Sequence, residues 1–144
     1  YVERRTQFRR QLPKLSENAS PDEIEADKRS LQKLIQAARV NAKQGNMFTQ
    51  SATQLIRSII KTEFKGYEGE EIRQTVLEAD TKGILLKVNA PYPVSKELVE
   101  MSPALLLALP QLPKELRYRY IGRSLVILDR DNALIIDFMK DALP

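Results

Sequence analysis

Residues 116–139, with the sequence LRYRYIGRSLVILDRDNALIIDFM, decide the fold because they read as three short strands joined by two tight turns. Gly122 and Arg123 make a two-residue loop of the Gly-X kind, which suits a type II′ turn since glycine accepts a positive φ at the first central position. The predicted strands of this antiparallel meander cover 116–121, 125–128 and 133–139. The turn fixes a register with three facing pairs: Ile121 with Ser124, Tyr120 with Leu125, and Tyr118 with Ile127.

Side chains alternate between two faces along the first of these strands. Leu116, Tyr118 and Tyr120 share one face, whereas Arg117 and Arg119 lie on the other. The tyrosines thereby become cross-strand packing partners of aliphatic residues, worth roughly 0.2 to 1 kcal/mol for each pair. A protein that reads single-stranded nucleic acid instead exposes aromatic rings beside basic side chains. The alternation therefore favours a structural hairpin.

The next two strands are apolar without alternation. The runs LVIL at 125–128 and LII at 134–136 predict that both faces of the sheet are covered. The amphipathic helices of the first half are expected to cover one face. Residues 105–112, or a second subunit, are expected to cover the other. Asn132 is expected to take the left-handed conformation in the loop before the last strand.

The first 79 residues predict a helical half with three or four amphipathic helices. A short helix over 1–15 turns Phe8 toward the core, opposite an arginine face, and ends early at Pro13. Ser20 begins a second helix as the N-cap of an S-x-x-E capping box. The apolar stripe of this second helix runs on until Gly45 ends it.

A third helix is predicted to begin after Thr49 and to carry apolar residues at helical spacing as far as Phe64. Gly66 then lies beyond its end. A fourth, shorter helix is predicted over 70–79. The apolar stripes of the second and third helices must be buried against another element. The simplest arrangement is that they pack against each other.

Residues 84–144 form the second half, in which the meander is preceded by a β-like segment at 84–88. A short leucine-rich helix over 103–109 is capped by Ser102. The whole chain, 1–144, is therefore expected to be a single α+β domain. Its N-terminal helices precede a small antiparallel meander that is covered by helices.

The composition narrows the chemistry that the chain can perform. Cysteine and histidine are both absent, which removes thiolate nucleophiles, cysteine-based zinc sites and the commonest general base. The pattern D-x-D at 129–131 lacks the later ligands of a calcium loop, and no phosphate-binding motif occurs. No apolar stretch approaches the roughly 18 residues of a membrane-spanning helix. We predict no catalytic residue, no cofactor and no metal site.

Arginines form two candidate partner-binding patches. The net charge is +4, and residues 1–14 carry the whole excess, so an acidic partner or an anionic membrane surface could be attracted there. The alternative for this first patch is a solvated helix that docks its apolar side on the core. The second patch flanks the hairpin. The candidate residues are Arg4, Arg5, Arg9 and Arg10 in the first patch, and Arg117, Arg119 and Arg123 in the second.

The carboxylates of Asp and Glu are the only abundant side chains in the sequence that commonly act as catalytic groups. Glu68, Glu70 and Glu71 precede a predicted helix, and Asp129 and Asp131 lie at a hairpin tip. Paired carboxylates catalyse hydrolysis when a cleft holds them close together and burial raises one pKa. Acidic groups at a helix start or a hairpin end are ordinary structural features, and nothing in the sequence indicates that these are buried.

The C-terminal block resembles a module of small exported bacterial proteins, among them the periplasmic nickel/cobalt-homeostasis family. The chain as a whole, with GNMF at 45–48 and IRQTVLEAD at 72–80, resembles an uncharacterised group of exported bacterial proteins. This resemblance implies the fold of the hairpin module and a periplasmic or secreted location after removal of a signal peptide. It implies no metal site, because histidine is absent. The matching residues are Leu109, Pro110, Tyr118, Arg119, Gly122, Leu125, Val126, Leu128, Asp129, Ile136 and Asp137.

The sequence thus predicts a non-enzymatic exported protein that presents a surface to a protein partner. A homodimer is one expected assembly. A carboxylate-based hydrolase of envelope polymers is the alternative function, and binding of single-stranded nucleic acid is the third.

Overall fold

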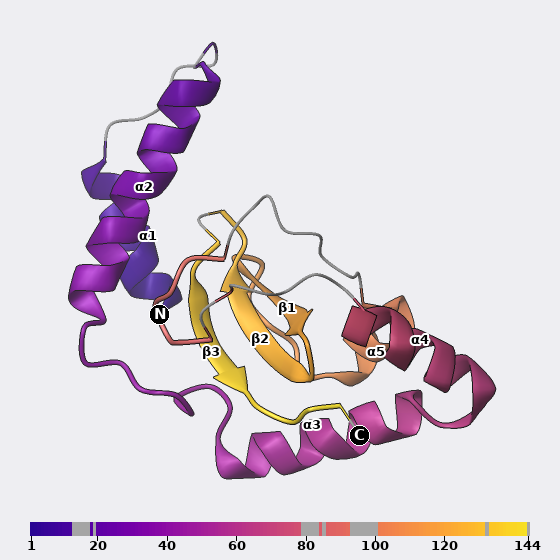
Figure 1. The fold of residues 1–144 in the computed structure, drawn as a ribbon. Coiled ribbons are helices and arrows are strands. Elements are labelled where there is room, and N and C mark those ends of the chain that lie inside the picture. The colour runs from indigo at the N-terminus through magenta and orange to yellow at the C-terminus, as the bar shows by residue number, and fades with distance from the viewer. Residues whose placement is uncertain are drawn as a thin grey trace.

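The computed structural model describes residues 1–12, 18, 20–78, 84, 86–92, 101–131 and 133–143, and for 66–68 and 78 it describes the backbone alone. Over this part of the chain, five helices precede a three-stranded antiparallel sheet (Figure 1). The helices lie toward the N-terminus and the strands at the C-terminus, so the predicted α+β class is confirmed.

The sheet has the order β1-β2-β3 and the predicted register. Its strands are β1 (Leu116–Ile121), β2 (Ser124–Asp129) and β3 (Ile135–Met139). Ile121 lies opposite Ser124 and Tyr118 lies opposite Ile127, as the turn requires. Gly122 has a φ of 55°, the positive value that a tight hairpin needs.

The third strand begins later than predicted. Ala133 takes a positive φ of 57°, and Leu134 forms an isolated bridge with Pro91 before the ladder with β2 starts at Ile135. These two residues therefore join β3 to a neighbouring segment instead of extending the strand. The conformation predicted for Asn132 lies outside the described residues.

One face of the sheet is covered by helices. Tyr118 and Tyr120 point into this core and are only 5% and 4% exposed, so their predicted role as interior packing is confirmed. Their rings contact Phe48 and Phe64, with centroids 6.5 and 6.2 Å apart respectively. Leu105 belongs to the same cluster, so the segment predicted to cover the opposite face lies on the helical side instead.

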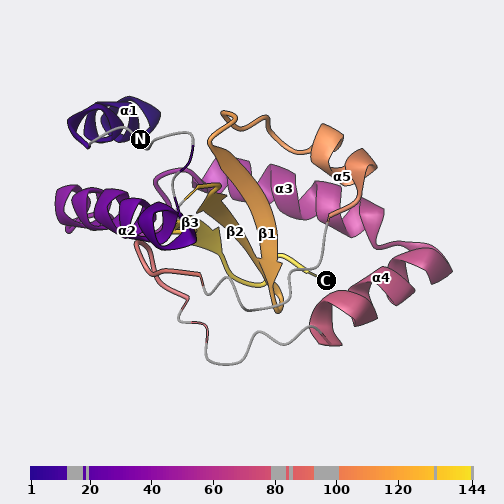
Figure 2. The same ribbon diagram turned by 90° about the horizontal axis from the view of Figure 1, so that it is seen from above.

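The other face is covered by the chain between the halves. Val88, Ala90 and Tyr92 are buried against Val126 and Phe138, among other residues of β2 and β3. Figure 2 shows this segment and α3 on opposite sides of the sheet. A second subunit is therefore not needed to complete the core.

The strand predicted at 84–88 is wrong. The described residues of that segment form no strand, and the chain turns at Lys87 and Val88. The backbone of Asn89 and Ala90 then bonds that of Ile135, with N–H groups donated in both directions at 2.7 and 2.9 Å. Pairing with the edge of β3 thus falls a few residues later than the apolar pattern indicates.

Three helices, α2, α3 and α5, begin at the residues that their caps predict. The bounds of the helices are α1 (Val2–Gln11), α2 (Pro21–Ala38), α3 (Gln50–Glu63), α4 (Gly66–Glu78) and α5 (Pro103–Ala108). The side chains of Ser20, Thr49 and Ser102 each accept a hydrogen bond from the backbone N–H three residues later. These three contacts satisfy N–H groups that have no partner inside the helix.

The second helix ends earlier than its apolar stripe predicts. It stops at Ala38, and the carbonyl of Arg39 accepts hydrogen bonds from the side chain of Asn89 at 2.6 Å and from the N–H of Ala42 at 2.9 Å, neither of which is the i to i+4 bond of a continuing helix. The chain then runs on as a loop in which Gly45 has a φ of 101°. Gly45 therefore shapes the loop and does not end the helix.

The fourth helix begins at Gly66, which was predicted to be only a stop signal after α3. A Cβ atom at Gly69 would lie 2.4 Å from the carbonyl carbon of Phe64, so glycine alone permits this close corner between α3 and α4. Glu70 and Glu71 consequently lie inside α4 and not ahead of it.

Candidate functional site

A buried ion pair attaches α1 to the end of β2. Arg5 donates from Nε to Oδ2 of Asp129 at 2.6 Å and from Nη2 to Oδ1 at 3.2 Å, and it also pairs with Asp131. The hydroxyl of Tyr1 donates to the same Asp129 carboxylate. Burial alone would lower the pKa of Arg5, but the hydrogen bonds to Asp129 and Asp131 outweigh it and raise that pKa.

Arg5 and Asp129 are therefore structural residues. They are 6% and 0% exposed, so the expectation of a solvent-exposed Arg5 is wrong, as is the expectation that Asp129 lies in an ordinary exposed turn. Bidentate pairing of this kind compensates two buried charges. An arginine on a short polar helix gives no sign in the sequence of a partner more than 120 residues away, which is why the pair was missed.

A second buried carboxylate, Asp137, holds the loop between α2 and α3. It accepts hydrogen bonds from the backbone N–H groups of Gly45, Met47 and Phe48 at 2.8 to 2.9 Å. Asp137 is fully buried on β3. The GNMF segment and the last strand, which both carry the resemblance to exported proteins, thus contact each other. An acidic residue inside the apolar run LIIDFM was the available signal for this site.

The remaining arginines of the first predicted patch have different surroundings. Arg9 pairs with Asp27 on α2, whereas Arg10 is exposed. Arg4 is exposed and reaches the carbonyl of Ala38 at 3.5 Å. On α1, the positive charge that could attract a partner is therefore mainly that of Arg4 and Arg10.

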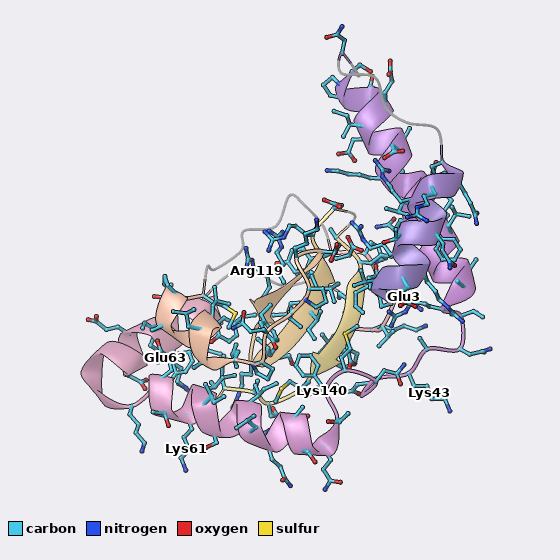
Figure 3. The ribbon with its side chains drawn as sticks, turned by 180° about the vertical axis from the view of Figure 1, so that it is seen from behind. Glu3, Lys43, Lys61, Glu63, Arg119 and Lys140 are labelled. Atoms are coloured by element: carbon cyan, nitrogen blue, oxygen red, sulfur yellow. The ribbon has the colours of Figure 1, made fainter. Side chains whose placement is uncertain are left out.

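The second predicted patch is divided between β1 and the hairpin turn that follows it. Arg123 lies in the hairpin turn, where it donates to the carbonyl of Leu143 at 3.3 Å. Arg117 lies near the other end and Arg119 in the middle of the strand, and both line one groove with Arg130, which the sequence does not indicate. Figure 3 shows Arg119 on the side of the sheet that faces away from α3 and Lys61.

These three arginines line a groove of about 280 Å³, which we call the edge groove. Four consecutive residues of β1, from Leu116 to Arg119, form its floor, and the chain leading from α5 into β1 forms its wall. Its described lining contains no acidic side chain. The edge groove thus follows the outer border of the sheet, because β1 pairs with β2 on one side only among the described strands.

The backbone of β1 points alternate polar groups into this border. Residues that flank a two-residue hairpin loop form a hydrogen-bonded pair, and such pairs alternate along the ladder. The backbone groups of Leu116, Tyr118 and Tyr120 therefore point away from β2. The carbonyl of Tyr118 accepts a hydrogen bond from Nη1 of Arg119 at 2.8 Å, and the N–H of Leu116 donates to Pro113 at 3.0 Å.

Two further cavities adjoin α1. The basic cavity, about 490 Å³, lies between α1 and the end of α2 and is lined by Arg4, Arg5 and Arg39. The apolar cavity, about 550 Å³, lies between the start of α1, α3 and the segment 110–113. Tyr1 and Met47 line both cavities, so the two lie on either side of these side chains.

Neither buried carboxylate lines any of these three cavities. Asp129 and Asp137 are each occupied by the structural contacts given above, and Glu70 is exposed on α4, where it pairs with Arg73. The described carboxylates Asp129, Asp137 and Glu70 are therefore each engaged in contacts within the chain.

The aromatic platform of a single-strand binder is likewise not formed by β1, because the rings of Tyr118 and Tyr120 are buried on the face opposite Arg117 and Arg119. Among the described residues, no three acidic side chains come together as a metal site would require. No helix within the described ranges is long and apolar enough to cross a membrane. No family model matches the sequence, and no curated protein and no solved structure is significantly similar to it.

Proposed function

We propose that the protein is a non-enzymatic interaction module that binds an acidic, extended segment of a protein partner along the edge groove. The observation that carries this proposal is the border of β1, where three arginines line a groove with no acidic side chain in its described lining. Exposed strand edges accept an additional strand through backbone hydrogen bonds, and neighbouring side chains then give specificity.

The contact between Arg119 and Tyr118 indicates how binding would proceed. Arg119 occupies the outward carbonyl of Tyr118, which an incoming strand would need as an acceptor. A carboxylate on the partner would draw the guanidinium toward itself, since charge-assisted bidentate bonds are stronger than a bond to a neutral carbonyl. The carbonyl would then accept an N–H from the partner's backbone. Charge recognition and strand addition would thus occur together.

An acidic partner fits this border better than a second copy of the chain. Two copies paired through β1 would bring arginines opposite arginines, and like charges directly across a strand pair are destabilising. The homodimer expected from the sequence is therefore not proposed at this edge. A single-stranded nucleic acid would also lack the stacking rings that it normally uses, because those of Tyr118 and Tyr120 are buried.

Export to the periplasm or beyond the cell belongs to the same proposal. It is supported by the resemblance of the C-terminal module to small exported bacterial proteins. The two segments that carry this resemblance, GNMF and the last strand, are joined through Asp137, so they act as one structural unit. The expected partner is accordingly a protein of the cell envelope.

A random peptide library displayed on phage tests the binding proposal. Peptides selected on the wild-type protein should be enriched in Asp and Glu, and their affinity should fall as salt is added. The double variant Arg117→Gln with Arg119→Gln should bind these peptides at least about tenfold more weakly. In nuclear magnetic resonance titrations, the amide signals of Tyr118 and Tyr120 should shift on binding.

The matched control is the double variant Arg10→Gln with Lys43→Gln, which removes the same charge from exposed positions outside the groove. It should bind as the wild type does. Selected peptides without acidic enrichment, or equal binding by the Arg117 and Arg119 variant, would contradict the proposal.

A further inference from the structure

The geometry points to a second binding site, independent of the edge groove, for a carboxylate amphiphile such as a medium-chain fatty acid. The apolar chain would occupy the apolar cavity, and the carboxylate would occupy the basic cavity. The inference rests on three observations: the composition of each cavity, the side chains that they share, and the state of Arg39.

The apolar cavity is lined almost entirely by hydrophobic side chains. Ala52 and Ile56 of α3 form one wall, Leu112 and Pro113 form another, and Ile127 of the sheet forms the base. Glu3, which is exposed, is the one charged residue in the described lining of this cavity. A volume of about 550 Å³ lies within the range of small-molecule sites, roughly 300 to 1,000 Å³.

The basic cavity supplies the complementary charge. Arg4, Arg5 and Arg39 line it together with Asn41 and Asn46, and its described lining contains no acidic side chain. Arg5 is occupied by Asp129 and Asp131. The guanidinium groups of Arg4 and Arg39 are therefore the ones that can hold an anion.

Arg39 is in an environment that favours an incoming anion. Its side chain lies over the ring of Tyr1, with 5.1 Å from its central carbon to the ring centroid, and its Nη2 donates to the carbonyl of Ile136 at 2.9 Å. Its buried Nε atom has no hydrogen-bond partner. A buried donor without a partner costs free energy, and a carboxylate oxygen in the basic cavity would satisfy it after a small movement of the Arg39 side chain.

The two shared side chains connect the cavities. Tyr1 and Met47 separate the arginines from the apolar walls, so a ligand that fills both cavities must pass over them. Methionine adapts its shape readily to an apolar chain. A molecule with one anionic group at the end of an unbranched hydrocarbon chain matches this arrangement.

Isothermal titration calorimetry with octanoate, decanoate and dodecanoate below their micelle concentrations tests the site. One molecule should bind per chain, and affinity should increase about fourfold for each added methylene that enters the apolar cavity. Dodecyltrimethylammonium, which carries the opposite charge, should not bind.

Two variants assign the site without disturbing the core. Arg4→Gln removes an exposed head-group contact, and Ala52→Leu fills the apolar cavity, and each should weaken dodecanoate binding at least about tenfold. Their matched controls, Arg10→Gln and Ala37→Leu, change exposed positions outside both cavities and should bind as the wild type does.

Absence of dodecanoate binding would overturn the inference, as would affinity that does not depend on chain length. Binding to phosphatidylglycerol vesicles without binding of monomeric dodecanoate would show that only a membrane surface is recognised, and it would also overturn the site. The Arg117 and Arg119 double variant should bind dodecanoate normally, so failure here is distinguishable from failure of the proposed peptide binding.

Discussion

At the scale of single residues, several polar side chains that the sequence places at the surface or in exposed turns are buried in the core. The rings of Tyr118 and Tyr120 fill the core on the helical face. Asp129 and Asp137 are both fully buried, one held by a guanidinium group and the other by backbone N–H groups. Both carboxylates and the Tyr118 hydroxyl have partners within the chain, which is the condition under which such groups are tolerated in a core, whereas the buried hydroxyl of Tyr120 has no hydrogen-bond partner.

Tyr118 gives the first prediction, because burial raises the pKa of its hydroxyl to about 12. The ordinary tyrosine value is about 10, so the unfolded chain releases this proton first as the pH rises. The contribution of this raised pKa to the free energy of unfolding is fully present below about pH 10 and is lost as the pH rises toward 12. The loss is on the order of 3 kcal/mol in total. Urea unfolding between neutral pH and about pH 11 should show this decline.

The variant Tyr118→Phe isolates the contribution. At neutral pH it should lose about 1 kcal/mol, because the hydroxyl no longer donates to the carbonyl of Pro110, a bond of 2.7 Å. Above about pH 10 its stability should decline less steeply than that of the wild type. Parallel pH profiles for the two proteins would show that Tyr118 does not titrate with a raised pKa.

The sequence predicts the tyrosine positions but not the carboxylate partners. Alternation along β1 and a two-residue turn determine which side chains share a face, and both are local properties. The partner of Asp129 comes from Arg5 at the other end of the chain, and no spacing rule connects the two. For the same reason Arg130 was not selected for the edge groove: only the folded hairpin brings it beside Arg117 and Arg119.

At the scale of elements, the starts of α2, α3 and α5 were predictable from their caps, whereas the start of α4 and the end of α2 were not. The three predictable starts are set by Ser20, Thr49 and Ser102 through contacts three residues apart. The end of α2 is instead held by Asn89, which is distant in the sequence and donates to the carbonyl of Arg39. The sheet face opposite the helices is likewise covered through a contact between distant parts of the sequence, because residues 89–92 form backbone hydrogen bonds with residues 133–135.

Gly69 gives the prediction at this scale. In most helices Gly→Ala stabilises by roughly 0.5 to 1 kcal/mol, because alanine loses less backbone freedom on folding. At Gly69 the added Cβ would lie 2.4 Å from the backbone of Phe64, so α4 would have to move away from α3. Gly69→Ala should therefore destabilise the protein by roughly 1 to 3 kcal/mol in urea unfolding. A gain in stability would show that the corner between the helices is more open than described.

At the scale of the whole molecule, the N-terminal helix is joined to the C-terminal sheet through one carboxylate. α1 is antiparallel to α2 (Figure 1), and its own attachment to the sheet runs through Tyr1, Arg5 and Asp129. Phe8 and Leu12 add apolar contacts at the border of the helical core. Both cavities proposed to hold an amphiphile have walls made by α1, so their shape depends on this attachment.

Asp129→Asn should release α1 from the rest of the molecule. The change leaves the buried guanidinium of Arg5 without its main counter-charge, and breaking a buried pair in this way costs roughly 3 to 5 kcal/mol. Asp131→Asn is the control, because the side chain of Asp131 is 65% exposed and its contribution should stay below about 1 kcal/mol. Urea unfolding measures the loss of unfolding free energy in each variant, and hydrogen exchange shows which segment of the chain opens. In Asp129→Asn the amides of α1 should exchange faster than in the wild type. The amides of β2 should still exchange only when the whole protein unfolds, so their protection should match the global free energy of unfolding of the variant. Unchanged protection of α1 would mean that Phe8 and Leu12 hold the helix by themselves and that the ion pair is not what joins α1 to the sheet.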